Sequence, residues 1–141
     1  MTEIDAILDG LLLDLRASRV TLRQDLPGDY AFPVTHEALA PGVGSLATER
    51  TVDLRNQPVV AELVQGRQVV QTDCRRAHDE PAFQAMLDLY GGLAAQIVTP
   101  IFVADRLAAI VSLHQLGAPR VWTDADVAAC TSAANAIARR L

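Results

Sequence analysis

Two apolar runs near the C-terminus constrain the fold of this chain more than any other feature. Residues 94–103 and 106–116 are rich in β-branched and aliphatic side chains, and only Ala104 and Asp105 separate them. A two-residue connection joins antiparallel strands, so the pattern predicts a long β-hairpin. Because apolar residues occupy both faces of the second run, we expect the hairpin in the middle of a sheet. Pro100 lacks a backbone N–H and is expected at a bulge or a free edge.

Helices are predicted at both ends of the chain. Residues 2–15 carry apolar side chains at spacings of three and four, which is typical of an amphipathic helix. Thr123 is a good N-cap for a second helix over residues 123–141, whose other faces are rich in alanine. Leu13 falls outside the apolar stripe of the first helix and indicates a second buried face, and hence a partner helix.

The middle of the chain predicts shorter elements, and its first strand contains alternating residue types. Val20 and Leu22 alternate with Arg19, Thr21 and Arg23, so we expect a strand with one face in solvent. The predicted elements are strands over 18–24, 30–35 and 68–72, helices over 57–64 and 81–89, and a long loop over 36–53 with one short helix. Together these elements predict an α+β fold, with a mostly antiparallel central sheet and both terminal helices on one of its faces.

Composition narrows the class of protein. The 141 residues are 50% hydrophobic, which suits one domain over residues 1–141. The net charge of −5 has the wrong sign for a surface that tracks nucleic-acid phosphates. All twelve basic residues are arginine, so Schiff-base chemistry and a phosphate-loop lysine are excluded. Without a signal peptide or a membrane-spanning run, we expect a cytoplasmic protein with reduced cysteines and no metal site.

The chain resembles the GAF domain family over essentially its whole length, strongly after about residue 67 and weakly before residue 57. The residues that carry the resemblance are 69–73, 98–101, 105–107, 110–114 and 119–124, followed by the alanine-rich last helix. The resemblance implies a GAF/PAS-like fold in a stand-alone GAF domain. It also implies a ligand pocket on the sheet face opposite the terminal helices, roofed by the loops and helices of residues 36–92. It does not identify the ligand.

Four polar residues are candidates for that pocket. Ser112 and His114 share one face of their strand, and Gln96 joins them if the register of the hairpin allows. Tyr90 follows a helix and combines an aromatic wall with a hydroxyl group, which suits a mixed site. Each also has a structural interpretation, as a strand end in contact with solvent or as core packing.

Asp73 and Arg75 form a second candidate for ligand binding. A carboxylate beside guanidinium groups suits an amino-acid-like ligand, and surface ion pairing is the alternative. Cys74 lies between them, and basic neighbours lower the pKa of a thiol, so a reactive thiol is expected there. Bilin-binding GAF domains attach the chromophore through a cysteine usually followed by histidine, whereas Cys74 is followed by Arg75.

Our sequence-based interpretation is a sensory or regulatory domain without catalytic residues or a cofactor. The ligand is expected to be a small polar or amphipathic metabolite. The output is expected through the terminal helices, in a homodimer or with a signalling protein, and without nucleic acid or membrane. Two alternatives stay open. One is a thiol-based redox enzyme or sensor that uses Cys74, similar to the free methionine sulfoxide reductases, and the other is a structural dimerisation module with a collapsed pocket.

Overall fold

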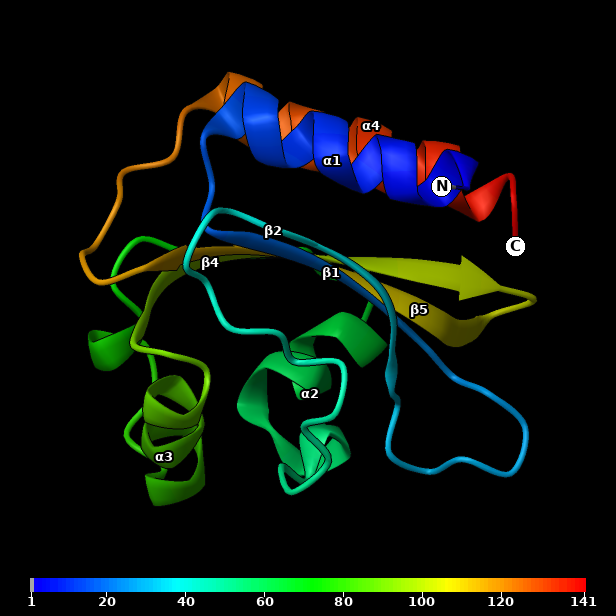
Figure 1. Ribbon diagram of the computed structural model, residues 1–141. Coiled ribbons are helices and arrows are strands. Elements are labelled where there is room, and N and C mark those ends of the chain that lie inside the picture. The colour runs from blue at the N-terminus through cyan, green and yellow to red at the C-terminus, as the bar shows by residue number, and fades with distance from the viewer. Residues whose placement is uncertain (1) are drawn as a thin grey trace.

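A five-stranded antiparallel sheet forms the centre of the computed structural model, which describes residues 2–141 (Figure 1). In spatial order the strands are β2 (Val34–Leu39), β1 (Arg19–Gln24), β5 (Arg106–Leu116), β4 (Leu93–Val103) and β3 (Val69–Gln71). The predicted hairpin is confirmed as β4 and β5. Both residues of its turn have positive φ, 51° at Ala104 and 63° at Asp105, as a type I′ turn requires.

The hairpin lies inside the sheet because each of its strands has a further neighbour. β5 pairs with β1, and β4 pairs with β3 over residues 96–98. Pro100 lies beyond the stretch of β4 that β3 covers, and a bulge follows between Ile101 and Phe102. The missing N–H of Pro100 therefore leaves no gap in the ladder with β3.

Helices α1 (Glu3–Leu15) and α4 (Asp124–Ala138) lie side by side on one face of the sheet (Figure 1). Thr2 and Thr123 cap them, each in a reciprocal capping box with an aspartate three residues later. The apolar residues between helices and sheet include Leu8, Leu11, Val20, Leu22, Leu113 and Ile137. Trp122 packs at the start of α4, and its Nε1 donates to the carbonyl oxygen of Gln71 at 3.0 Å.

The other face carries α2 (Pro58–Val64), α3 (Pro81–Leu89) and two short 3-10 helices, η1 (Leu54–Asn56) and η2 (Cys74–Arg76). Figure 1 shows α2 and α3 on the side of the sheet opposite α1 and α4. A second apolar cluster fills this layer and includes Phe32, Leu63, Phe83, Leu87, Val98 and Ile110. The predicted helices over 57–64 and 81–89 are thereby confirmed within a residue.

The strand predicted over residues 30–35 is shifted along the chain. The strand found there, β2, covers residues 34–39. Phe32 is fully buried with φ of 56°, a left-handed conformation that no strand residue adopts. Asp29 Oδ1 also accepts from the N–H of Ala31 at 3.0 Å and stabilises a turn there. The chain between β1 and β2 is therefore an irregular connection over residues 25–33.

The prediction that one face of β1 is in solvent is wrong. Arg19 is 1% exposed and Arg23 is 6% exposed, and Thr21 between them is also buried. Arg19 donates to the carbonyl oxygens of Gly44 and Tyr90, so the loop before η1 and the end of α3 reach over this face. Alternation shows which residues share a face, but it does not show what covers that face.

Candidate ligand-binding site

A cavity lies between the sheet and the layer of α2 and α3. Its volume is about 30 Å³, which is room for about two water molecules. Val59, Val60 and Leu63 of α2 and Met86 of α3 contribute apolar lining. The polar lining residues are Arg23, Gln57, Tyr90, Gln96, Ser112 and His114.

The register of the central strands brings three predicted residues together. Gln96 lies directly opposite His114 in the β4–β5 pair, and Ser112 lies two positions along β5 on the same face. Tyr90 follows α3, and its ring stacks on that of His114 with centroids 5.9 Å apart. The structure therefore places Gln96, Ser112, His114 and Tyr90 around one cavity, whereas their contact with a ligand stays a prediction.

His114 is held in one tautomer. Its Nδ1 lies 3.1 Å from Nε of Arg19, and because a guanidinium only donates, Nδ1 accepts. Burial, reinforced by the charges of Arg19 and Arg23, holds the pKa of His114 well below its ordinary value of 6.5. The neutral ring therefore carries its proton on Nε2. Within residues 2–141, the only side-chain hydrogen bond of His114 is the one to Arg19, so Nε2–H has no protein partner.

Arg19 lies outside the cavity lining and binds the backbone of Tyr90, which belongs to that lining. Its Nη2 donates to the carbonyl oxygen of Tyr90 at 2.7 Å, and its Nη1 donates to that of Gly44 at 3.0 Å. Burial lowers the pKa of Arg19 to about 10, against a favourable interaction with the charge of Glu37. Arg19 is therefore still charged at neutral pH. The carboxylate of Glu37 accepts hydrogen bonds from the Ser45 hydroxyl and the Leu46 N–H and is not in contact with Arg19.

Arg23 reaches the cavity itself. Its Nη1 donates to the carbonyl oxygen of Phe32 at 3.0 Å, and its Nη2 donates to the hydroxyl of Tyr90 at 3.1 Å. Burial raises the pKa of Tyr90, so the phenol keeps its proton while its oxygen accepts from Arg23. The phenol O–H is thus left to donate elsewhere.

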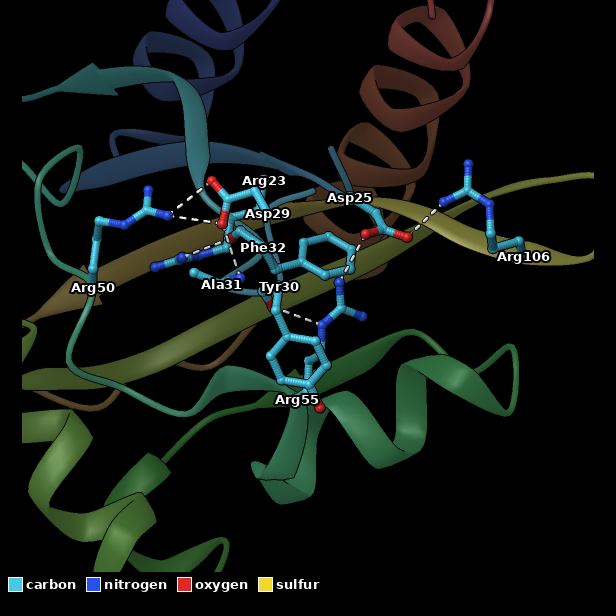
Figure 2. A network of polar contacts seen from close by, with 9 residues as sticks. All are labelled: Arg23, Asp25, Asp29, Tyr30, Ala31, Phe32, Arg50, Arg55 and Arg106. Atoms are coloured by element: carbon cyan, nitrogen blue, oxygen red, sulfur yellow. Dashed lines mark hydrogen bonds and ion pairs between the residues drawn. The ribbon is translucent and has the colours of Figure 1, made fainter. Parts of the chain in front are cut away.

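The buried arginines differ from the surface arginines in their partners. Figure 2 shows Arg50 on the carboxylate of Asp29, at 2.8 Å, and Arg55 and Arg106 on opposite oxygens of Asp25, at 2.8 and 2.6 Å. Among residues 2–141, neither Arg19 nor Arg23 forms an ion pair with a carboxylate. A buried charge without a carboxylate in direct contact carries a desolvation cost that carbonyl and hydroxyl partners offset only in part.

Gln57 supplies an unpaired acceptor on the roof of the cavity. The residue is 5% exposed, and its Nε2 donates to the carbonyl oxygen of Ala82 at a long 3.4 Å. Its Oε1 has no partner among the described residues. In contrast, Nε2 of Gln96 donates to Oε1 of Gln71 at 2.8 Å, so these two side chains partly satisfy each other.

Asp73 and Arg75 lie outside the residues that line the cavity. Arg75 binds the exposed carboxylate of Asp88 at 2.6 Å and the side chain of Gln84 at 3.0 Å. Oδ2 of Asp73 lies 3.7 Å from Nε of Arg76. The structure thus separates this pair from the four residues at the sheet, and ligand binding by the pair stays an untested prediction.

The expectation of a reactive thiol at Cys74 is wrong. The side chain is fully buried, and burial raises its pKa to about 12, with Asp73 adding to the effect and Arg75 opposing it. Burial likewise raises the pKa of Cys130 to about 12. The neighbouring arginines point away, because Arg75 and Arg76 are both exposed. Sequence proximity to basic residues therefore does not activate this thiol.

Within residues 2–141, no group of three or more His, Cys, Asp or Glu side chains is placed to hold a metal ion. No helix in the same part of the chain has the length and apolar character that a membrane span requires.

The sequence analysis missed Arg19, Arg23 and Gln57 as parts of this site. For the arginines a signal existed, because they occupy alternate positions in a strand whose other face is apolar. If that strand had been placed beside the hairpin, a covered second face would have followed. Gln57 carried no such signal, because it directly precedes a short helix and resembles any polar residue there.

An antiparallel sheet with two helices on one face and a partly polar cavity beneath the other has the features of a domain with an internal small-molecule site. The sequence profile of the GAF domain matches residues 2–141, and the chain belongs to that family. Among curated proteins, no sequence matches it significantly.

Solved structures of photoreceptor GAF domains share the fold. The photoproduct state of a GAF domain, GAF3, from Synechocystis sp. PCC6803 has a TM-score of 0.75 at 19% identity, covering 97% of this chain and 92% of that one. The blue-light absorbing form of the PixJ GAF domain of Thermosynechococcus elongatus has a TM-score of 0.73 at 21% identity, covering 98% and 86%. The chromophore-binding domain of a bacteriophytochrome from R. palustris has a TM-score of 0.78 at 16% identity, covering 97% and 53%. At these identities the similarity shows the fold alone.

Proposed function

We propose that this protein is a non-catalytic sensory GAF domain that binds a small metabolite in the cavity beneath β4 and β5. The observation that carries the proposal is the buried, unpaired Oε1 of the cavity-lining residue Gln57. It is supported by the Nε2–H of His114, another lining residue, whose ring is hydrogen-bonded only through Nδ1 among the described residues. Buried polar groups normally have partners, and each one left alone costs about 1–3 kcal/mol. A ligand that pairs with both groups would remove that cost.

This polar lining favours ligand binding over a purely structural module. A module that serves only to pack two helices needs no arginine, histidine and glutamine beside an internal space, since aliphatic side chains fill such a space at lower cost. The buried thiols also disfavour the redox alternative, because a pKa of about 12 leaves almost no thiolate at neutral pH.

A tetrapyrrole like the phycocyanobilin of a structurally similar cyanobacterial phytochrome is not the ligand we propose. Ligands of that size need pockets of several hundred Å³, whereas this cavity provides about 30 Å³. Cys74 is buried and lies outside the cavity lining, so it does not suit covalent attachment either.

The output is proposed to pass through α1 and α4. β1 and β5 carry Arg19 and His114 on the cavity side and Val20 and Leu113 against the helices, so a shift of these strands reaches both layers. Leu13 is 73% exposed on α1, as expected from the sequence, and offers an apolar contact to a second copy. Light scattering is expected to show a dimer for the native protein and a monomer for Leu13→Glu, and a native monomer at high micromolar concentration would contradict it.

A cavity-filling variant tests ligand binding. Val60 of α2 lines the cavity and is 5% exposed, whereas Val64 of the same helix is 55% exposed. A thermal-shift screen with amino acids, organic acids, amines and neutral metabolites is expected to identify ligands that raise the Tm of the native protein and of Val64→Phe. At about 100 times Kd the stabilisation is about 2.7 kcal/mol. Val60→Phe is expected to abolish the shift, and an equal response of the two variants would contradict the proposal.

A further inference from the structure

We propose that the ligand is a small organic acid: a short-chain monocarboxylate that carries a hydrogen-bond donor, such as a hydroxyl, next to the carboxylate. This inference rests on the proposed function and names the chemistry of the ligand. It combines three independent features of the cavity, namely its charge, its donors and its apolar roof.

The first feature is charge. Arg23 lines the cavity, and Arg19, which does not, is hydrogen-bonded to the lining residue His114. Within residues 2–141, no carboxylate is in contact with either arginine. Their π contacts are to one ring, because both guanidinium carbons lie about 6 Å from the centroid of Tyr90, at 5.9 and 6.0 Å. Glu37 and Glu49 interact with Arg19 and Arg23 through their charges without forming an ion pair. An anion in the cavity would place an opposite charge in direct contact with Arg23.

The second feature is that the sheet side of the cavity offers mainly donors. Arg23 uses two N–H groups on Phe32 and Tyr90 and has further N–H groups, because a guanidinium carries five. The phenol of Tyr90 accepts from Arg23, which leaves its O–H to donate. His114 contributes Nε2–H because Arg19 occupies its Nδ1. A carboxylate only accepts, so it complements this set of groups.

The third feature is the roof, which distinguishes an organic acid from an inorganic oxyanion. Oε1 of Gln57 is an acceptor and would repel an anion, but it suits a hydroxyl or ammonium donor on the same ligand. Around it lie the aliphatic side chains of Val60, Leu63 and Met86. Nitrate would leave both the amide oxygen and the apolar roof without a partner.

The size of the cavity gives the orientation of the ligand. Room for about two waters suits a carboxylate group, with the aliphatic body directed at the roof. An open surface groove on the far side of the roof is lined by Gln57 and Met86 as well, together with Ala82 and Ala85 of α3. Met86 is flexible, and Gln57 is held by one hydrogen bond of 3.4 Å. The cavity holds only the carboxylate, so the aliphatic body would occupy this groove, and its entry would require the side chains of Gln57 and Met86 to move apart.

Calorimetric titration of the full chain with four matched probes tests the inference. The probes are 2-hydroxyisovalerate, isovalerate, isovaleramide and sodium nitrate, each at up to about 10 mM. We expect saturable binding of 2-hydroxyisovalerate, binding of isovalerate weaker by several-fold, and weaker binding still of isovaleramide and nitrate. Arg23→Gln is expected to weaken 2-hydroxyisovalerate about tenfold or more, as hydrogen bonds to a charged group predict. Arg23→Lys keeps the charge and is expected to retain part of the affinity. Arg67→Gln serves as the control, because Arg67 is an exposed arginine outside the cavity lining.

Several results would overturn the inference. In the probe series, these are the absence of saturable binding by either acid, equal affinity for isovaleramide and isovalerate, and tighter binding of nitrate than of both acids. For the variant, the contradicting result is an unchanged affinity of Arg23→Gln in a protein with a native circular dichroism spectrum. The proposed function fails separately. If neutral or cationic metabolites raise the Tm and Val60→Phe abolishes that shift, the cavity is a ligand site but the acid is wrong. If no compound distinguishes Val60→Phe from Val64→Phe, both proposals fall.

Discussion

The guanidinium of Arg19 donates to Nδ1 of His114 at 3.1 Å, 95 residues away in the sequence, and this contact determines what the imidazole presents to the cavity. Arg19 and His114 are also directly paired across β1 and β5. The two side chains therefore meet because of strand register, and the arginine turns a histidine that would be ambiguous into a fixed N–H donor.

The first prediction concerns the pH dependence of stability. Burial lowers the pKa of His114 in the folded state below its ordinary 6.5, so the unfolded chain binds a proton that the folded chain does not. The free energy of unfolding therefore falls as pH drops below about 6.5. Urea denaturation at about pH 7 and about pH 5 measures how much the free energy of unfolding falls between the two. We expect a smaller fall for His114→Gln than for the native protein.

His36→Gln is the matched control for this measurement, because His36 is a half-buried histidine on β2 outside the cavity. Nitrogen-detected NMR provides an independent test and is expected to place the imidazole proton on Nε2. A proton on Nδ1, or an equal pH dependence for His114→Gln and the native protein, would contradict the assignment.

The second prediction is that Arg23 lowers stability in favour of binding. Arg23→Met removes a buried charge that has no ion pair, at the loss of hydrogen bonds to Phe32 and Tyr90. Relief of desolvation exceeds that loss, so the free energy of unfolding is expected to stay equal or rise by up to about 2 kcal/mol. Denaturant titration measures it. Arg75→Met, on the surface, should change stability by less than about 1 kcal/mol, and a loss above about 2 kcal/mol in Arg23→Met would show that Arg23 is structural.

The third prediction concerns thiol reactivity. With pKa values of about 12, Cys74 and Cys130 are almost entirely protonated and buried at neutral pH. Native protein is expected to react with a thiol-specific chromogenic reagent at a small fraction of the rate of the urea-unfolded chain. Mass spectrometry assigns the labelled residue, and Cys130 serves as the internal comparison. Rapid labelling of Cys74 in the native protein would revive the redox alternative.

The fourth prediction concerns the turn of the central hairpin. Ala104 has φ of 51°, a left-handed conformation that is unfavourable for alanine and better tolerated by asparagine. Ala104→Asn is expected to raise the free energy of unfolding by about 0.5–1 kcal/mol. Ala118→Asn is the control, at an exposed alanine outside that turn. Destabilisation by Ala104→Asn would show that the turn is not type I′ in solution.

Much of the fold was predictable because its signals are local. The hairpin, the terminal helices and the helices over 57–64 and 81–89 each depend on residue periodicity, a cap or a turn within a few positions. The irregular connection over 25–33 was not predictable in this way. There the left-handed conformation of Phe32 is held by burial and by Arg23, which donates to its carbonyl oxygen. Local propensity does not anticipate such a conformation.

The candidate site was predictable only in part. Gln96, Ser112 and His114 followed from alternation along two strands once the hairpin was recognised, and Tyr90 followed from its place after a helix. Asp73 and Arg75 are neighbours in sequence, yet the structure places them outside the cavity lining. Arg19 and Arg23 were assigned to solvent because arginine is rarely buried, and only the segments packed over β1 reverse that assignment.

The sequence by itself thus determined the family, the order of elements and the face on which each strand residue lies, because these depend on local periodicity and covalent order. The tertiary structure decided which of those faces are buried. That decision matters most for Arg19 and Arg23, since the same guanidinium is an ordinary solvated group on a surface and a charge with a high desolvation cost inside a protein.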